Sequence, residues 1–298
     1  MSMPFPEGLR PLSSSAQVYP ISDVPGNNGP PAPMTALLLF ASYDRLRLQI
    51  YREHGPCGER IKVGSIGSVT LLRFEDVGYF NRVYAPDEAV SEQLAEVEAF
   101  YDGSPFGCEL IGPTNGSSCR IDRECLRQRW VPGERYAWLA APPAMIALPE
   151  GTNGFEVRPP GEAERELFLL AYLRGFEANT ECVPAAVQNM RHLFKCPDLR
   201  FLMAFRAGRP AGIGMLYFAG KVAVLCAGAT LREYRRQGCH TSLLRARLRL
   251  AVEQDCENIF SWAAARGQSH ANMERAGLQT VGITAAWRLP ADRERRRC

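Results

Sequence analysis

The decisive stretch is Ala229-Thr-Leu-Arg-Glu-Tyr-Arg-Arg-Gln-Gly-Cys-His-Thr241. It follows an apolar run, residues 222–227, which predicts a buried strand. It precedes residues 242–252, whose apolar spacing predicts an amphipathic helix. The first N–H groups of a helix have no internal partner, and the helix dipole makes that end positive, so it attracts anions. Gly238 lets the backbone approach an anion closely, and Arg235 and Arg236 add positive charge. The stretch therefore predicts a turn that binds pyrophosphate.

Two common phosphate-binding patterns do not fit this turn. A P-loop needs Gly-x-x-x-x-Gly-Lys-Ser/Thr, and a dinucleotide fingerprint needs three glycines, whereas only Gly238 is present. The segment Arg235-Arg-Gln-Gly-Cys-His240 instead resembles the acetyl-CoA loop of the GNAT superfamily of N-acetyltransferases, Gln/Arg-x-x-Gly-x-Gly/Ala. His240 stands where that pattern has a small residue.

The flanking segments follow the element order that this resemblance implies. Asn272 to Gly277 also resembles the family's second coenzyme motif, in which an Asn precedes a short helix that ends in Gly. The resemblance covers roughly residues 155–290. Apolar periodicity there predicts strands at 155–158, 201–205, 213–217, 222–230, 259–262 and 281–287, and helices at 162–173, 183–194, 242–252 and 269–277.

The N-terminal half shows a similar order of predicted elements, without the motif. Residues 78–86 occupy the place of the phosphate loop but have no Gly beside the helix start. The remaining elements are helices at 34–54, 88–101 and 123–130, and strands at 68–74, 107–111 and 136–139. We therefore expect an α/β fold of tandem GNAT-like domains, each with a mostly antiparallel mixed sheet flanked by helices. The expected bounds are a poorly ordered leader (1–33), a degenerate domain (34–140), a linker (141–154), the acetyltransferase domain (155–290) and a basic tail (291–298).

Composition excludes several other classes of protein. The net charge of +3 is too small to predict nucleic-acid binding, and no apolar run approaches the length of a membrane span. The N-terminus does not resemble a signal peptide, and the ten cysteines include no Cys-x-x-Cys pair. We expect a cytoplasmic protein without a metal, present as a monomer or homodimer.

The resemblance implies acetyl-CoA as the co-substrate. Free backbone groups of the strand end would hold the pantetheine arm like an added strand, and loop amides would bind the pyrophosphate. A backbone N–H near Cys226 or Ala227 would stabilise the developing oxyanion. The expected coenzyme-binding residues are Ala229, Thr230, Leu231, Arg235, Arg236, Gln237, Gly238, Cys239, His240, Thr241 and Asn272.

The acid and the base of the reaction are less well marked. Met273 stands where many family members have a Tyr that protonates the thiolate, and Met cannot donate a proton. His270 and His240 are the candidates to replace it, and Glu233 is the candidate base; each could instead be a capping, packing or solvated side chain. Cys239 falls at the predicted helix start, where its pKa should fall.

The acceptor is expected to lie between the first two helices and the last strands of the C-terminal half, near residues 175–181 and 283–287. Glu177 and Glu181 would attract a cationic amine there, or simply end a helix. The predicted function is an acetyl-CoA-dependent N-acetyltransferase that acts on the primary amine of a small molecule, by direct attack in a ternary complex. The alternatives are a non-catalytic acyl-CoA-binding regulator and a scaffold protein.

Overall fold

A computed structural model describes residues 33–113, 119–128, 130–146, 153–178 and 183–291. Most of the predicted leader and tail, part of the linker, and Glu181 lie outside these ranges. In the part of the chain that the structure describes, no helix has the length and apolar character needed to cross a membrane.

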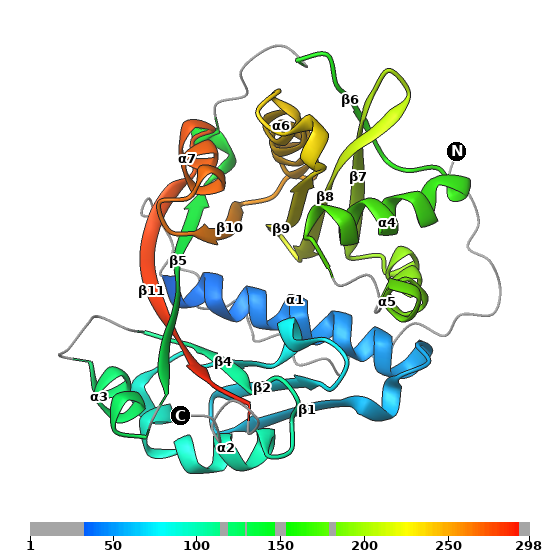
Figure 1. The fold of residues 1–298 in the computed structure, drawn as a ribbon. Coiled ribbons are helices and arrows are strands. Elements are labelled where there is room, and N and C mark those ends of the chain that lie inside the picture. The colour runs from blue at the N-terminus through cyan, green and yellow to red at the C-terminus, as the bar shows by residue number, and fades with distance from the viewer. Residues whose placement is uncertain (1–32, 114–118, 129, 147–152, 179–182, 292–298) are drawn as a thin grey trace.

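The described chain forms a single mixed sheet with helices on both faces (Figure 1). The strand order is β1-β2-β3-β4-β11-β5-β10-β9-β8-β7-β6. The strands are β1 (Ile61–Ile66), β2 (Val69–Phe74), β3 (Arg82–Tyr84), β4 (Cys108–Ile111), β5 (Val131–Ala141), β6 (Glu156–Arg158), β7 (Leu199–Arg206), β8 (Arg209–Ala219), β9 (Val222–Thr230), β10 (Asn258–Ala264) and β11 (Gln279–Leu289). The α-helices are α1 (Pro33–His54), α2 (Leu94–Tyr101), α3 (Arg120–Arg127), α4 (Arg165–Gly175), α5 (Val183–Met190), α6 (Cys239–Glu253) and α7 (Gln268–Arg275).

The two halves repeat one arrangement. Each has a parallel strand pair, β3 with β4 and β9 with β10, while the other neighbouring strands are antiparallel. Helix α2 connects the first parallel pair and α6 connects the second, because parallel strands need a long crossover. The predicted mixed, mostly antiparallel α/β fold is confirmed.

The last strand of each half pairs with the other half. Strand β5 lies between β10 and β11, and β11 lies between β5 and β4 (Figure 1). Buried indole N–H groups anchor this exchange: Trp138 Nε1 donates to Thr284 Oγ1 at 2.9 Å, and Trp287 Nε1 donates to Asp122 Oδ1 at 2.6 Å. The predicted domain bounds stay a prediction, because the sheet has no break between the halves.

Helix α1 lies in the middle of the molecule and packs against both halves (Figure 1). The ring centroid of Phe40 is 5.8 Å from that of Trp138 and 5.2 Å from that of Trp262. A second apolar core lies under α6 and α7, and a third lies under α2 and α3. Because α1 shares one core with β9 and β10, residues of the N-terminal half lie against the centre of the C-terminal half.

Several segments of the N-terminal half differ from the prediction. Residues 78–86, expected as a loop, contain a 3-10 turn, η3 (Gly78–Phe80), and the short strand β3. The predicted helix 88–101 is the 3-10 helix η4 (Glu88–Glu92) followed by α2. Strand β1 was not predicted, because its exposed polar residues weaken the apolar alternation.

The strand exchange predicts that neither half folds alone. A fragment ending at residue 146 leaves β4 and β5 without β11, and one beginning at residue 153 leaves β10 and β11 without β5. Each fragment should therefore lack a cooperative thermal transition in circular dichroism, and the two should regain one when co-expressed. A cooperative transition in the isolated C-terminal fragment would show that the exchange is dispensable.

Candidate functional site

Strands β9 and β10 separate in the middle of the sheet. They pair from Val222 and Asn258 as far as Leu225 and Ser261, where Ser261 Oγ donates to the Leu225 carbonyl at 3.2 Å. Beyond this point β9 follows β8 and β10 follows β5. No described strand pairs with this edge of β9 from residue 226 to residue 230. Within this stretch the Ala227 carbonyl accepts from Arg247 and the Thr230 carbonyl accepts from Arg235.

A β-bulge lies where the strands separate. Gly214 pairs with Gly228 and Leu216 pairs with Leu225, so Cys226 and Ala227 of β9 together oppose Met215 of β8. A bulge turns backbone groups out of the ladder. The bulge lies at Cys226 and Ala227, the two residues near which the sequence predicts the amide that faces the thioester.

A buried arginine from α6 supports the bulge. Arg247 is 1% exposed, and its Nη1 donates to the Ala227 carbonyl at 3.1 Å. Its Nη2 has no hydrogen-bond partner among the described residues. The neighbouring strand pair Gly214–Gly228 leaves room for the Arg247 side chain. A Cβ at Gly228 would lie 2.8 Å from Arg247 Nη2, and a Cβ at Gly214 would lie 3.0 Å from Arg247 Cδ.

No described carboxylate forms an ion pair with Arg247, and burial lowers its pKa to about 10. A buried cation without a counter-ion is costly, so its place behind the bulge suggests a role beyond packing. The sequence did not single it out, because Arg247 is one of three arginines that alternate along α6 and arginine is rarely buried.

A turn joins β9 to α6 at the predicted place, and its binding of phosphate stays a prediction. The turn η9 (Arg232–Tyr234) follows β9, and α6 begins directly after Gly238. Gly238 has φ +89°, a left-handed conformation that favours glycine, and a Cβ there would lie 2.7 Å from the Asn153 side chain. The structure thus brings the strand end 229–231 and the turn 235–241 together at the start of α6.

Side chains of the turn are held by neighbouring residues. Arg235 Nη2 donates to Glu177 Oε1 at 2.9 Å, and Arg235 Nε donates to the Thr230 carbonyl at 3.3 Å. Gln237 Nε2 donates to the Glu233 carbonyl at 2.8 Å, and Arg206 donates to Gln237 Oε1. Glu177 therefore lies beside the phosphate turn, and its predicted part in acceptor binding is untested.

His240 faces α7. Asn272 Nδ2 donates to His240 Nδ1 at 3.0 Å, and Ser269 Oγ lies 3.3 Å from His240 Nε2. Burial first, and the charge of Arg247 second, lower the pKa of His240 to about 4. The ring is therefore neutral at neutral pH and joins α6 to α7, and its predicted role as an acid stays untested.

The other two acid–base candidates lie apart from the bulge. His270 is buried, accepts from the Arg266 N–H at Nδ1 (2.9 Å) and lies 2.7 Å from Thr280 Oγ1 through Nε2. Glu233 is exposed, and one of its oxygens lies 3.9 Å from Arg174 Nη2. These contacts tie His270 to the packing of α7 against β11. Catalytic roles for both residues stay predictions.

The expectation for Cys239 is wrong in one respect. Its thiol lies in the core under α6, fully buried, and burial raises its pKa to about 11. The helix dipole favours a thiolate, but desolvation outweighs that effect here. The thiol of Cys226 is likewise buried enough that its pKa is raised, so neither cysteine is an activated nucleophile.

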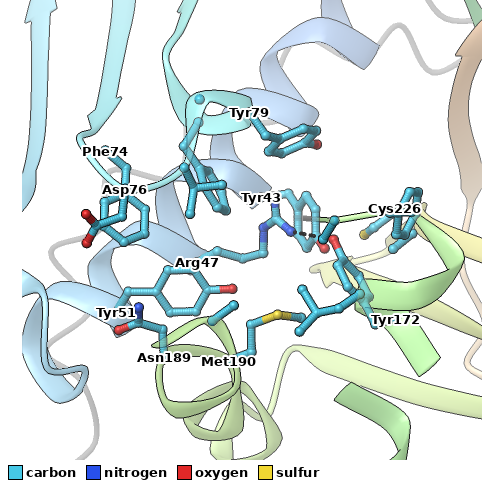
Figure 2. Close-up of a pocket in the computed structure, with 18 of the residues that line it drawn as sticks. Tyr43, Arg47, Tyr51, Phe74, Asp76, Tyr79, Tyr172, Asn189, Met190 and Cys226 are labelled. Atoms are coloured by element: carbon cyan, nitrogen blue, oxygen red, sulfur yellow. Dashed lines mark hydrogen bonds between the residues drawn. The ribbon is translucent and has the colours of Figure 1, made fainter. Parts of the chain in front are cut away.

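A cavity of about 540 Å³ reaches the bulge (Figure 2). Its walls come from α1, η3, α4 and α5, and its floor includes Cys226, Ala227 and Trp262. The other lining residues are Phe40, Tyr43, Arg47, Tyr51, Phe74, Asp76, Val77, Gly78, Tyr79, Phe80, Phe106, Tyr172, Leu173, Phe176, Ala178, Val183, Ala186, Asn189 and Met190. Part of the segment 175–181 lines it as expected, whereas the N-terminal half takes the place predicted for residues 283–287.

Comparisons with known proteins agree with this geometry. Residues 166–277 match the model of the Acetyltransferase (GNAT) family. A GCN5-related N-acetyltransferase from Kribbella flavida has a similar structure, with TM-score 0.59, 17% identity, and coverage of 85% of this chain and 95% of that one. A functionally unknown conserved protein from Staphylococcus epidermidis ATCC 12228 has TM-score 0.58, 12% identity and coverage of 76% and 92%.

A tandem GNAT protein from the clavulanic acid biosynthesis pathway has TM-score 0.55 and 10% identity, with coverage of 88% of this chain and 97% of that one. These likenesses concern the fold of most of the chain, across both of its halves. No curated protein matches the sequence.

The half-buried His240 predicts an acid-sensitive fold. Its pKa is about 4 in the folded protein and about 6.5 in an unfolded chain, so the unfolded state binds the proton first as the pH falls. The free energy of unfolding should decrease from about pH 6.5 to about pH 4, by up to roughly 3 kcal/mol. Urea unfolding at several pH values should show that this free energy decreases less in His240→Gln than in the parent protein. The control is His54→Gln, whose parent side chain is 48% exposed.

Arg247→Met tests the support of the bulge. Loss of the bond to the Ala227 carbonyl is destabilising, but removal of an unpaired buried charge offsets it. We expect a melting temperature close to that of the parent and a rate of acetyl transfer at least roughly tenfold lower, because Arg247 holds the backbone whose amide is expected to stabilise the oxyanion, and loss of such a donor costs about that much or more. Equal turnover in a folded variant would reduce Arg247 to a packing residue.

Proposed function

We propose that this protein, whose residues 166–277 form a GNAT-family acetyltransferase domain, transfers an acetyl group from acetyl-CoA to the primary amine of a small molecule. The observation that carries the proposal is the meeting of two features at the bulge. The edge of β9 that no described strand covers begins at Cys226, and Cys226 also lines the cavity. A coenzyme arm along β9 and an acceptor in the cavity would therefore meet at one place.

The residues of the phosphate turn fit the coenzyme. Gly238 adopts a left-handed conformation directly before α6, where free N–H groups and the helix dipole favour a pyrophosphate. Arg236 and Arg235, the latter paired with Glu177, supply charge beside it. Residues 226–230 offer the pantetheine amides an edge that no described strand covers. Bound there, acetyl-CoA supplies an acetyl group activated as a thioester.

The bulge would stabilise the charge that develops during transfer. A backbone N–H of Cys226 or Ala227 would donate to the thioester oxygen, and Arg247 would hold that backbone in place through the Ala227 carbonyl. The new C–N bond forms as the C–S bond breaks, the amine loses one proton, and the sulfur leaves as a thiolate or gains one. A thiol has a pKa of about 8–9, so it leaves without an obligatory acid. Met273, buried in the α7 core, supplies no such acid.

A second candidate function is a regulator that binds acyl-CoA without turnover. It is favoured by Met273 and by the hydrogen bonds that engage both rings, His240 and His270. The two functions predict the same coenzyme binding and differ in thiol release alone.

Calorimetric titration with acetyl-CoA tests both. We expect about one equivalent bound per chain, and Gly238→Ala should weaken binding at least about tenfold, since the left-handed φ and the Asn153 contact disfavour a side chain. The matched control is Gly208→Ala, which has φ +74° and no atom near its Cβ position. An equal loss in both variants would indicate general backbone strain and would contradict the assignment of the turn.

A thiol-release assay with an amine panel then separates the enzyme from the regulator. Release of free coenzyme thiol that depends on an added amine supports the enzyme. Tight binding without release from any amine supports the regulator.

A further inference from the structure

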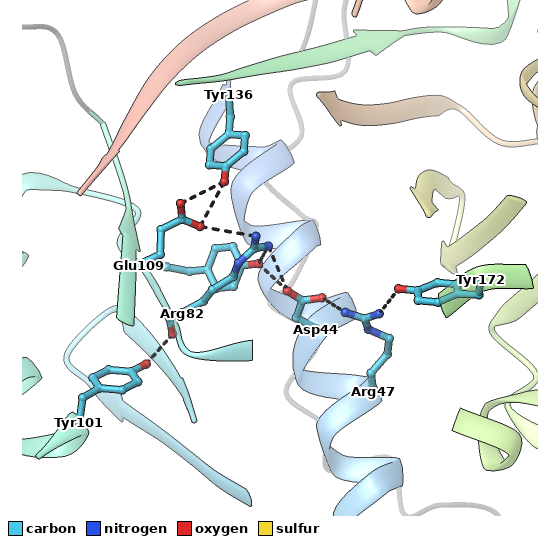
Figure 3. Close-up of polar contacts among 8 residues, drawn as sticks. Asp44, Arg47, Arg82, Tyr101, Glu109, Tyr136 and Tyr172 are labelled. Atoms are coloured by element: carbon cyan, nitrogen blue, oxygen red, sulfur yellow. Dashed lines mark hydrogen bonds and ion pairs between the residues drawn. The ribbon is translucent and has the colours of Figure 1, made fainter. Parts of the chain in front are cut away.

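The cavity wall opposite the bulge carries a buried charge network (Figure 3). Arg47 Nη2 lies 2.8 Å from Asp44 Oδ1, and Arg82 Nη1 lies 3.6 Å from Asp44 Oδ2, so two arginines share one carboxylate. Tyr84 Oη also donates to Asp44 Oδ2 at 2.6 Å. Both oxygens of Asp44 are thus engaged, and Asp44 is absent from the residues that line the cavity. Of the two cations in this network, Arg47 is the one that lines the cavity.

Two donors on this wall lack acceptors. Arg47 Nε and Tyr43 Oη are buried and have no hydrogen-bond partner within the described ranges. Figure 2 shows Arg47 extending across the cavity between Tyr43 and Tyr51, toward Tyr172, and Arg47 Nη1 lies 3.3 Å from Tyr172 Oη. Buried donors are almost always paired in native proteins. A ligand oxygen, above all a carboxylate, would pair with both.

The aromatic rings of the cavity do not favour a cationic ligand. Arg47 Cζ lies 4.4 Å from the ring centroid of Phe80 and 4.5 Å from that of Tyr43. Arg82 Cζ lies 4.0 Å from the ring centroid of Tyr79 and 4.8 Å from that of Trp262. These rings already interact with the two guanidinium groups. At low dielectric, the guanidinium charges would repel the ammonium group of a ligand. The rings still offer flat apolar surface to an aromatic body.

The described cavity wall also lacks a base. No His or Glu is among its described residues, and its carboxylate, Asp76, lies 2.6 Å from Arg60. An alkylamine is protonated at neutral pH and must lose that proton before it attacks. An arylamine is already neutral, because its lone pair is delocalised into the ring. The wall therefore suits an arylamine.

Resting on the proposed function, we propose that the acceptor is an arylamine that carries a carboxylate, with its ring between the aromatic side chains and its carboxylate on Arg47 and Tyr43. The rigid ring directs the amine away from the carboxylate, toward Cys226 and Ala227. The amine nitrogen forms the new bond to the acetyl carbon, the carbon–sulfur bond breaks, and the nitrogen proton leaves to solvent or to the thiolate.

Four amines test the carboxylate and the arylamine nitrogen separately: 4-aminobenzoate, aniline, 4-(aminomethyl)benzoate and benzylamine. Spermidine is added as a polycation. In thiol release with saturating acetyl-CoA, kcat/KM should be about 10- to 100-fold higher for 4-aminobenzoate than for aniline, the range of a charge-assisted hydrogen bond. It should also exceed that for 4-(aminomethyl)benzoate. The inference is overturned if benzylamine, 4-(aminomethyl)benzoate or spermidine reacts as fast as 4-aminobenzoate or faster. It is also overturned if aniline reacts as fast as 4-aminobenzoate.

Two variants locate the recognition. Arg47→Gln should reduce the reaction of 4-aminobenzoate to the level of aniline and leave acetyl-CoA binding unchanged; Asp44 keeps Tyr84 and Arg82 as partners. Phe176 is 49% exposed at the cavity rim, so it can be changed without loss of the fold. Phe176→Asp should raise KM for 4-aminobenzoate about threefold or more through like-charge repulsion, while Phe176→Leu should not.

Binding of acetyl-CoA distinguishes failure of the proposed function from failure of the acceptor assignment alone. If acetyl-CoA does not bind the parent protein, the proposed function fails and the inference fails with it. If acetyl-CoA binds and another amine class is acetylated, the proposed function stands and only the acceptor assignment falls.

Discussion

The pairing of β5 with β11 is the constraint on which the other features depend. Each strand is the last of its half, and each reaches a parallel pair of the other half, β10 or β4. The sheet is therefore continuous, and α1 packs on a face that both halves share. Without this exchange, the side chains of α1 would have no fixed position relative to the bulge in β9.

The shared face explains how the candidate site divides its tasks. The C-terminal half provides the open strand edge, the bulge and the phosphate turn. The N-terminal half provides Arg47 and most of the aromatic rings that face them across the cavity. Buried cations stand on both sides of Cys226 and Ala227, with Arg247 behind the bulge and Arg47 across the cavity. This arrangement suits a place where negative charge develops or where an anionic ligand binds.

Local sequence was sufficient to predict the elements around the phosphate turn. Strand β9 was predicted at its observed bounds, and Gly238 was placed in the turn just before a helix, because apolar periodicity and a turn glycine are both local signals. The short strand β3 was missed, since three residues carry no period. The exchange, the cavity and the burial of Arg247 depend on contacts between distant segments, and a single sequence does not encode these in any local pattern. For Cys239, the local dipole argument was outweighed by burial, which only the packing reveals.

The exchanged strands also affect how the protein folds during synthesis. Strand β5 emerges from the ribosome long before β10 and β11, its two neighbours in the sheet. Until then its backbone groups have no native strand partner, and the N-terminal half cannot complete its sheet. Domains of a chain generally fold one after another as they emerge, but here the first half must wait for the last described strand. Folding is thus a late event dominated by contacts between remote segments, which makes it slow, and the waiting edge of β5 is a point at which chaperones could protect the nascent chain.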